Sequence, residues 1–146
     1  MHQAHMIIQQ INWLAVLTST LAYFMLGAIW FNPKVFGSVW MKGHNIGAVT
    51  EEDKKKMPMM MITTFVLCFI GVIAMDYFVE VFRVYQVNWR WYSGVKVGLV
   101  AGCGFSGVGI AMNYMHTRKS WTLIIIDSSY HVAGMVIAGI ILSVWR

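Results

Sequence analysis

The residues of this sequence best suited to chemistry are an acid and an imidazole inside an apolar segment near the C-terminus. Asp127 and His131 are four residues apart, so a helix places both on one face. Counted from Trp121, Asp127 lies roughly 9 Å and His131 roughly 15 Å into the segment. A carboxylate at such a depth needs a partner or a proton. One hypothesis is a proton station, a site that binds and releases a proton or small cation, in which the imidazole changes its charge near neutral pH. The other is a clasp, a hydrogen bond that holds two helices together, in which Asp127 accepts from Tyr23, Tyr130 or His131.

A second group of ionisable residues lies at the end of another apolar segment. Asp76, Glu80 and Arg83 have spacings of four and three, which a helix also places on one face. Their position near the end of the segment predicts a solvated ladder of ion pairs at the membrane boundary. A depth difference of roughly 10 Å or more argues against a di-metal centre shared with Asp127 and His131. Of the six acids in the chain, we therefore expect Asp127 alone to lie deep.

Other candidate ligands favour ordinary structural roles. Four closely spaced methionines have the soft sulfur that copper(I) prefers, and Cys68 lies deeper in the same segment. A helix cannot turn all four methionines toward one ion. They are Met57, Met59, Met60 and Met61. We interpret them as apolar filler, and His2 and His5 as part of a solvated tail. The sequence has no phosphate-binding glycine loop, metalloprotease motif or nucleophile elbow. We expect no metal, no cofactor and no catalytic activity.

Long apolar segments must position these residues. Of the 146 residues, 58% are apolar and 12% are charged, about half the charge of a typical soluble domain. This composition excludes a cytosolic globule, a disordered chain and a nucleic-acid module, and two cysteines exclude a disulfide scaffold. A helix that spans a bilayer needs about 20 apolar residues. The sequence has four apolar segments close to that length, at about 11–31, 58–82, 94–115 and 120–145. Because they lack the alternation of barrel strands, they predict an all-α, up-and-down bundle of four transmembrane helices in a single domain, 1–146.

The distribution of basic residues predicts the orientation. The loop 32–57 holds five lysines and the turn before the last segment holds two more bases, against four bases on the opposite side. The excess places loop 32–57 in the cytoplasm and both termini outside. The first segment is too long for a signal peptide and has no preceding base, so we expect it to be retained.

The loop 32–57 has structure of its own. Asn32 and Pro33 have the residue types of a helix cap and first helical position. The residues that follow form an apolar face, so the loop predicts a short amphipathic helix at the lipid headgroups. Its interfacial anchor comprises Trp30, Pro33, Phe36, Gly37 and Trp40. Thr50 and Asp53 resemble a capping box, which predicts that the next helix begins before its apolar segment.

Small residues mark one face of the third segment. Gly94, Gly98, Gly102 and Ser106 recur every four residues, a spacing that lets membrane helices approach closely. A discontinuous helix lining a cavity is the alternative, but the segment contains no proline. The stripe is compatible with packing inside one chain or with another copy, so we expect a homo-oligomer or a subunit of a larger membrane complex.

The two ends of the chain also resemble a known family. The matching residues of the last segment include Asp127, Tyr130 and His131, and those of the N-terminal part are Asn12, Trp13, Leu14, Ala15, Val16, Gly27, Trp30, Phe31, Pro33, Phe36, Gly37, Trp40 and Met41. They resemble the uncharacterised bacterial family of small four-helix membrane proteins called domain of unknown function 1761. The resemblance implies the four-helix fold and carries no activity or catalytic residue.

Two classes of function follow. The first is a structural, accessory or lipid-interacting membrane subunit in which the polar residues only hold the helices. The alternative is a protein that binds or relays a proton or small cation through Asp127 and His131, with Tyr130 and Tyr23. The net charge of +5 comes mostly from loop lysines and arginines, so we expect membrane lipids as partners and no nucleic acid.

Overall fold

The protein is all-helical in a computed structural model that describes residues 11–145. Along the chain, the elements are α2 (Trp13–Trp30), the π-helical segment η1 (Pro33–Gly37), α3 (Ser38–Gly43), α4 (Glu51–Tyr85), α5 (Trp91–Ala101), the π-helical segment η2 (Gly102–Gly107), α6 (Val108–His116) and α7 (Trp121–Val144). Within residues 11–145, four helical stretches are long and apolar enough to cross a membrane: α2, α4, the continuous run α5–η2–α6, and α7. The predicted fold class is therefore confirmed.

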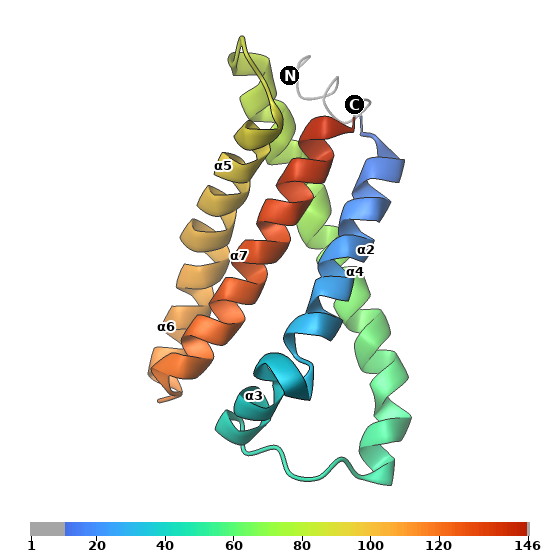
Figure 1. The fold of residues 1–146 in the computed structure, drawn as a ribbon, viewed down its shortest axis with the longest axis vertical. Helices are drawn as coiled ribbons and strands as arrows, with labels where there is room; N and C mark the ends of the chain where they lie inside the picture. Colours follow the sequence, from blue (N-terminus) through green and yellow to red (C-terminus); the bar gives the residue numbers. More distant parts are fainter. Residues whose placement is uncertain (1–10, 146) are drawn as a thin grey trace.

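The helices run alternately up and down. Figure 1 shows the start of α2 and the end of α7 at one end of the molecule, with α3 and the start of α4 at the other. The Asn12 side chain donates a hydrogen bond of 3.0 Å to the Trp145 carbonyl and so joins the start of α2 to the end of α7. Helix α7 packs against α2, α4, α5 and α6. It is therefore the helix around which the others are arranged.

Helix α4 begins well before its apolar segment. The Thr50 hydroxyl accepts from the Asp53 backbone N–H at 3.2 Å, and the Asp53 carboxylate accepts from the Thr50 N–H at 2.9 Å, which is the reciprocal capping box expected from these residue types. The helix starts at Glu51 and continues through Pro58. The apolar run that begins at residue 58 is thus extended by two turns of polar helix.

The connection from α2 to α3 turns sharply through η1. The Asn32 side chain accepts from the Lys34 N–H at 2.9 Å, with Pro33 in the first helical position. A Cβ atom at Gly37 would lie 2.1 Å from the Phe31 carbonyl oxygen, so only glycine fits this close turn. The expected amphipathic helix therefore has a π-helical first half and an α-helical second half.

Aromatic rings hold this connection against the bundle. The Trp30 and Phe36 ring centroids are 5.0 Å apart, and those of Phe31 and Trp40 are 5.3 Å apart. The Trp30 indole N–H also donates to the Ile126 carbonyl of α7 at 3.1 Å. The predicted anchor residues thus fold back onto the end of α2 and onto α7.

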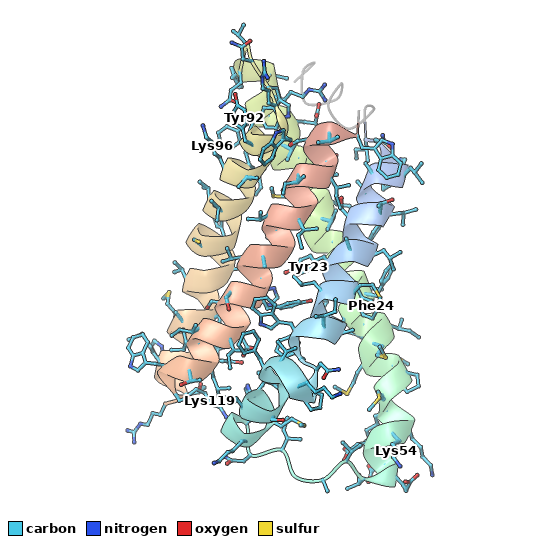
Figure 2. The ribbon with its side chains drawn as sticks, in the orientation of Figure 1. Tyr23, Phe24, Lys54, Tyr92, Lys96 and Lys119 are labelled. Carbon is cyan, nitrogen blue, oxygen red and sulfur yellow. The ribbon has the colours of Figure 1, made fainter. Side chains whose placement is uncertain are left out.

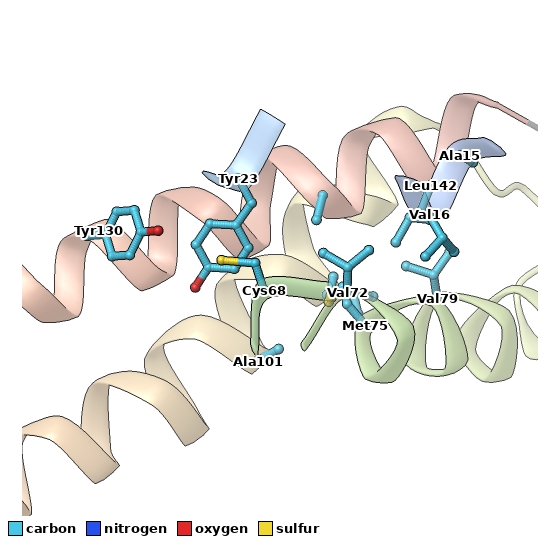
Figure 3. Packing of buried hydrophobic residues seen from close by; sticks show 12 residues of the cluster. Ala15, Val16, Tyr23, Cys68, Val72, Met75, Val79, Ala101, Tyr130 and Leu142 are labelled. Atoms are coloured by element: carbon cyan, nitrogen blue, oxygen red, sulfur yellow. The ribbon is translucent and has the colours of Figure 1, made fainter. Parts of the chain in front are cut away.

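The buried core is a narrow seam of apolar side chains along the bundle axis (Figure 3). It draws residues from every long helix: Ala15, Val16, Tyr23, Cys68, Val72, Met75, Val79, Val97, Ala101, Tyr130, Ala138 and Leu142. The outward faces are apolar too, since side chains such as Leu21, Ile62 and Ile125 are more than half exposed. Helices that are apolar on both faces suit a lipid solvent.

The glycine stripe of the third span faces α7 of the same chain. A Cβ atom at Gly94 would lie 2.1 Å from the Gly139 carbonyl oxygen, and one at Gly98 would lie 2.6 Å from the Met135 carbonyl oxygen. One at Gly102 would lie 2.7 Å from the Val132 Cα atom. The α5 backbone therefore lies directly against the α7 backbone.

The stripe does not continue through Ser106 as its spacing predicts. Ser106 borders a space beside Gly71 and Met75 of α4. Gly107 takes the position facing α7, 3.8 Å from the Ser128 Cβ atom for an added Cβ. The reason is the π-helical geometry of η2, which closes hydrogen bonds to the fifth residue instead of the fourth and so advances the face by one residue.

Candidate functional site

Asp127 is held by a tyrosine from the neighbouring helix. The Tyr114 hydroxyl of α6 donates to the Asp127 Oδ2 atom at 2.6 Å. Asp127 is only 7% exposed, and a buried carboxylate with a short charge-assisted hydrogen bond is strongly held. The prediction that Asp127 accepts from Tyr23, Tyr130 or His131 is wrong about the donor, because the turn between α6 and α7 brings Tyr114 closer.

A histidine from the α3 connection completes this group. The His44 Nε2 atom lies 3.8 Å from the Asp127 Oδ2 atom and 3.4 Å from the Tyr114 hydroxyl. Its ring packs on Trp40, with centroids 4.7 Å apart. His44 is the C-cap of α3, so the short helix delivers an imidazole to the carboxylate of α7.

The turn between α6 and α7 places Tyr114 opposite Asp127. The Lys119 N–H donates to the Tyr114 carbonyl at 2.9 Å, and Arg118 has a φ of 54° that reverses the chain. The Ser120 side chain then caps α7 by accepting from the Leu123 N–H at 3.4 Å. The turn thereby brings Tyr114 of α6 face to face with Asp127 of α7, although the two residues are thirteen positions apart in the sequence.

His131 pairs with a different tyrosine. The Tyr23 hydroxyl of α2 and the His131 Nδ1 atom are hydrogen-bonded at 2.5 Å. The Tyr130 ring lies beside both, with centroids 5.4 Å from Tyr23 and 4.8 Å from His131. The structure thus brings together Tyr23, Tyr130 and His131, three of the four predicted site residues. The fourth, Asp127, lies one helical turn before His131 on α7.

Glycines make room for these tyrosine rings. A Cβ atom at Gly134 would lie 2.1 Å from the Tyr23 ring, and one at Gly27 would lie 3.0 Å from the Tyr130 hydroxyl. The Tyr130 hydroxyl also interacts with the Cys68 thiol of α4. Figure 3 shows Cys68 beside Tyr23, where the polar residues meet the apolar seam.

The site therefore consists of two hydrogen-bonded groups one helical turn apart on α7, which together we call the polar path. His44 and Tyr114 meet at Asp127, and Tyr23 meets His131. Chemically, its hydroxyl, carboxylate and imidazole groups can exchange protons. Mechanically, they join α2, α3, α6 and α7. Tyr114 and His44 were missed by sequence reasoning, because no spacing in the sequence relates them to Asp127.

The second acidic group does not form the expected solvated ladder. Asp76 is 2% exposed and Glu80 is 6% exposed, although the Arg83 Nη1 atom lies 3.6 Å from the Glu80 Oε1 atom. The prediction failed because these residues share a face of α4 with Val72 and Val79, and that face packs into the bundle. Asp127 is therefore not the one buried acid among the described residues.

The two acidic groups lie at different levels. The Met75 Cε atom would contact a Cβ atom at Gly139 at 2.9 Å, so Asp76 is nearly level with Gly139. That residue is about 12 Å along α7 from His131. Among residues 11–145, no group of three or more histidine, cysteine or acidic residues is placed to hold a metal ion. Met57, Met60 and Met61 line one face of α4, which Met59 does not share. His2 and His5 lie outside the described residues.

The comparisons with known proteins place the chain in one family. No curated protein and no solved structure matches it. A family model described as "protein of unknown function (DUF1761)" matches residues 14–143, nearly the whole length. The chain therefore belongs to this uncharacterised family, as the residues at its two ends predict.

Proposed function

We propose that the protein is a small, non-catalytic subunit of a bacterial cytoplasmic membrane, where it associates with copies of itself or with a larger membrane complex and contacts lipid. Both termini lie outside and the lysine-rich connection lies in the cytoplasm. In this proposal, the polar path is a set of clasps that fixes how the helices meet.

One observation carries the proposal: the carboxylate and the imidazole of α7 are each held by a tyrosine of another helix. Tyr114 binds Asp127 at 2.6 Å, and Tyr23 binds His131 at 2.5 Å. A buried polar group without its partner costs about 1–3 kcal/mol, so these pairs disfavour any other arrangement of the helices. Hydrogen-bonded groups of this kind suit a fixed scaffold.

Two substitutions separate a clasp from a proton station. Tyr114→Phe removes the hydrogen-bond donor and leaves the titratable carboxylate in place. Asp127→Asn removes the titratable group and keeps a side-chain oxygen that can still accept from Tyr114. A clasp predicts that Tyr114→Phe lowers stability by about 1–3 kcal/mol and weakens association, while Asp127→Asn changes both less.

The measurements are the unfolding free energy in mixed micelles, the oligomer mass in mild detergent, and proton flux into liposomes loaded with a pH-sensitive dye. Tyr92→Phe serves as the control, since Tyr92 lies outside the polar path. Proton flux above that of empty liposomes, abolished by Asp127→Asn, would overturn the proposal. A monomeric wild-type protein that captures no membrane partner would also contradict it.

A second candidate function rests on the two groups of the polar path, which follow one another along α7. His44 has 18% of its side chain exposed, and proton-exchanging groups extend from it to Tyr23 near the middle of the bundle. This arrangement supports a site that takes up a proton or small cation from one side of the membrane. Beyond Tyr23, the path meets the apolar seam that contains Val72 and Met75. Because these side chains cannot exchange protons, a relay across the whole membrane is the second candidate.

A further inference from the structure

An apolar groove opens between α2 and the first half of α4. Its volume is 330 Å³, near the lower end of the range for ligand sites, about 300–1,000 Å³. In Figure 2, Phe24 lies where the two helices are close, and Lys54 lies at the far end of α4. The groove is lined by Phe24, Gly27, Ala28, Phe31, Met57, Met60, Met61, Thr64 and Tyr130.

Each wall is one helical face. The α2 wall runs from Phe24 to Phe31 and the α4 wall from Met57 to Thr64, each with the spacing of successive turns on one side of a helix. Each wall is about 10 Å long. The groove is therefore a straight channel between two helices, and its open side faces the surroundings of the bundle.

Few polar atoms lie along the groove. The Thr64 hydroxyl donates to the Met60 carbonyl at 2.8 Å, and the Tyr130 side chain is buried, at 6% exposed. The remaining lining is aromatic, aliphatic or thioether. An occupant therefore gains mainly from burying apolar surface.

The lining and size of the groove favour a hydrocarbon chain as the occupant. Its walls are almost wholly apolar over a length of about 10 Å, and its volume of 330 Å³ is that of a small ligand site. A helix of a second copy is the other candidate occupant, and the test below distinguishes the two.

A lysine lies close in sequence to each wall, at the end of the bundle where α2 finishes and α4 begins. Lys34 follows Phe31 by three residues, and Lys54 precedes Met57 by three residues. Lys54 pairs with Glu51 at 2.6 Å, but both side chains are well exposed, at 59% and 83%. An exposed pair of this kind is weak, so a phosphate can replace Glu51 as the partner of Lys54.

We propose that this groove binds one anionic phospholipid, with an acyl chain between α2 and α4 and the phosphate between Lys34 and Lys54. The inference rests on the lipid contact in the proposed function and names its site. The polar path through Asp127 takes no part in it.

The test compares two neighbouring positions of α2. Ala28→Trp fills the groove, whereas Ile29→Trp adds the same side chain at a residue that is 61% exposed and does not line the groove. Each protein is reconstituted in vesicles of phosphatidylcholine and phosphatidylglycerol, extracted in mild detergent and weighed by native mass spectrometry. We expect wild type and Ile29→Trp to retain one phosphatidylglycerol per chain and Ala28→Trp to lose it.

A second pair of variants tests the headgroup and leaves the groove wall intact. Replacing Lys34 and Lys54 by glutamine should reduce the preference for phosphatidylglycerol over phosphatidylcholine roughly 30-fold. The matched control replaces Lys42 and Lys119 by glutamine and should retain the preference. Circular dichroism of all four variants checks that the helices form.

Three outcomes would contradict the proposed lipid site. In the first, Ala28→Trp retains as much lipid as wild type. In the second, Ile29→Trp also loses the lipid, and in the third, Ala28→Trp loses a dimer and not a lipid. The last would identify a second copy as the occupant. None of them affects the flux and stability measurements on Tyr114 and Asp127, so failure of the lipid site and failure of the proposed function are distinguishable.

Discussion

The close approach of α5 and α7 leads to a sharp prediction about Gly94. In Gly94→Ala, the new Cβ atom would lie 2.1 Å from the Gly139 carbonyl oxygen and 2.3 Å from the Ser143 hydroxyl oxygen. The hydroxyl can rotate away, but the carbonyl belongs to the α7 backbone. The two helices must therefore separate by about 1.3 Å to restore ordinary van der Waals contact, which begins near 3.4 Å.

The expected cost follows from this geometry. Overpacking in a well-packed interior costs about 1–3 kcal/mol, and a backbone clash belongs at the upper end. Alanine in place of glycine in a helix returns about 1 kcal/mol of intrinsic propensity. Gly109→Ala is the matched control, because its Cβ atom would meet nothing within 4 Å. The propensity gain cancels between the two variants, so Gly94→Ala should be about 3 kcal/mol less stable than Gly109→Ala.

The assay is reversible unfolding in mixed micelles titrated with a denaturing detergent and followed by far-ultraviolet circular dichroism. Oligomer mass is measured on the same samples. Equal unfolding free energies for the two variants would refute the close packing of α5 on α7. A smaller oligomer with unchanged unfolding free energy in Gly94→Ala would show that the stripe faces another copy.

Three further outcomes can be checked with the same protein. Thr50→Ala removes the capping box of α4, so amide exchange in the first turn should accelerate as the helix end loses about 1 kcal/mol, with global stability unchanged. Trp30→Phe removes the hydrogen bond to the Ile126 carbonyl and should lower the unfolding free energy by about 1 kcal/mol, whereas Trp121→Phe, at an exposed ring, should not. A water-soluble carbodiimide should modify the exposed acids at the start of α4 and spare Asp76, which peptide mass mapping would reveal; equal modification would contradict its burial.

Much of the architecture was predictable because it depends on local sequence. Continuous apolar segments must form helices in lipid, since no other single segment satisfies its own backbone there. Asn32 with Pro33, and Thr50 with Asp53, mark helix starts through hydrogen bonds that span only a few residues. Such signals require no knowledge of the rest of the fold.

The rotation of each helix about its own axis was not predictable in the same way. When every face of a helix is apolar, periodicity does not say which face meets a neighbour. Asp76 was therefore expected in solvent and is buried, and Ser106 was expected on the glycine stripe that Gly107 continues. The π-helical turn that causes the second difference has no signature among its glycines.

Four long helices, their caps, and an acid and a histidine four positions apart on the last helix follow from the order of residues alone. That Tyr114 and His44 meet Asp127, and that Tyr23 meets His131, follows from how the helices pack. The difference lies in the range of the interactions. Helix formation follows from interactions within a few residues, whereas the partner of a buried polar group depends on which turns and rotations let whole helices pack together.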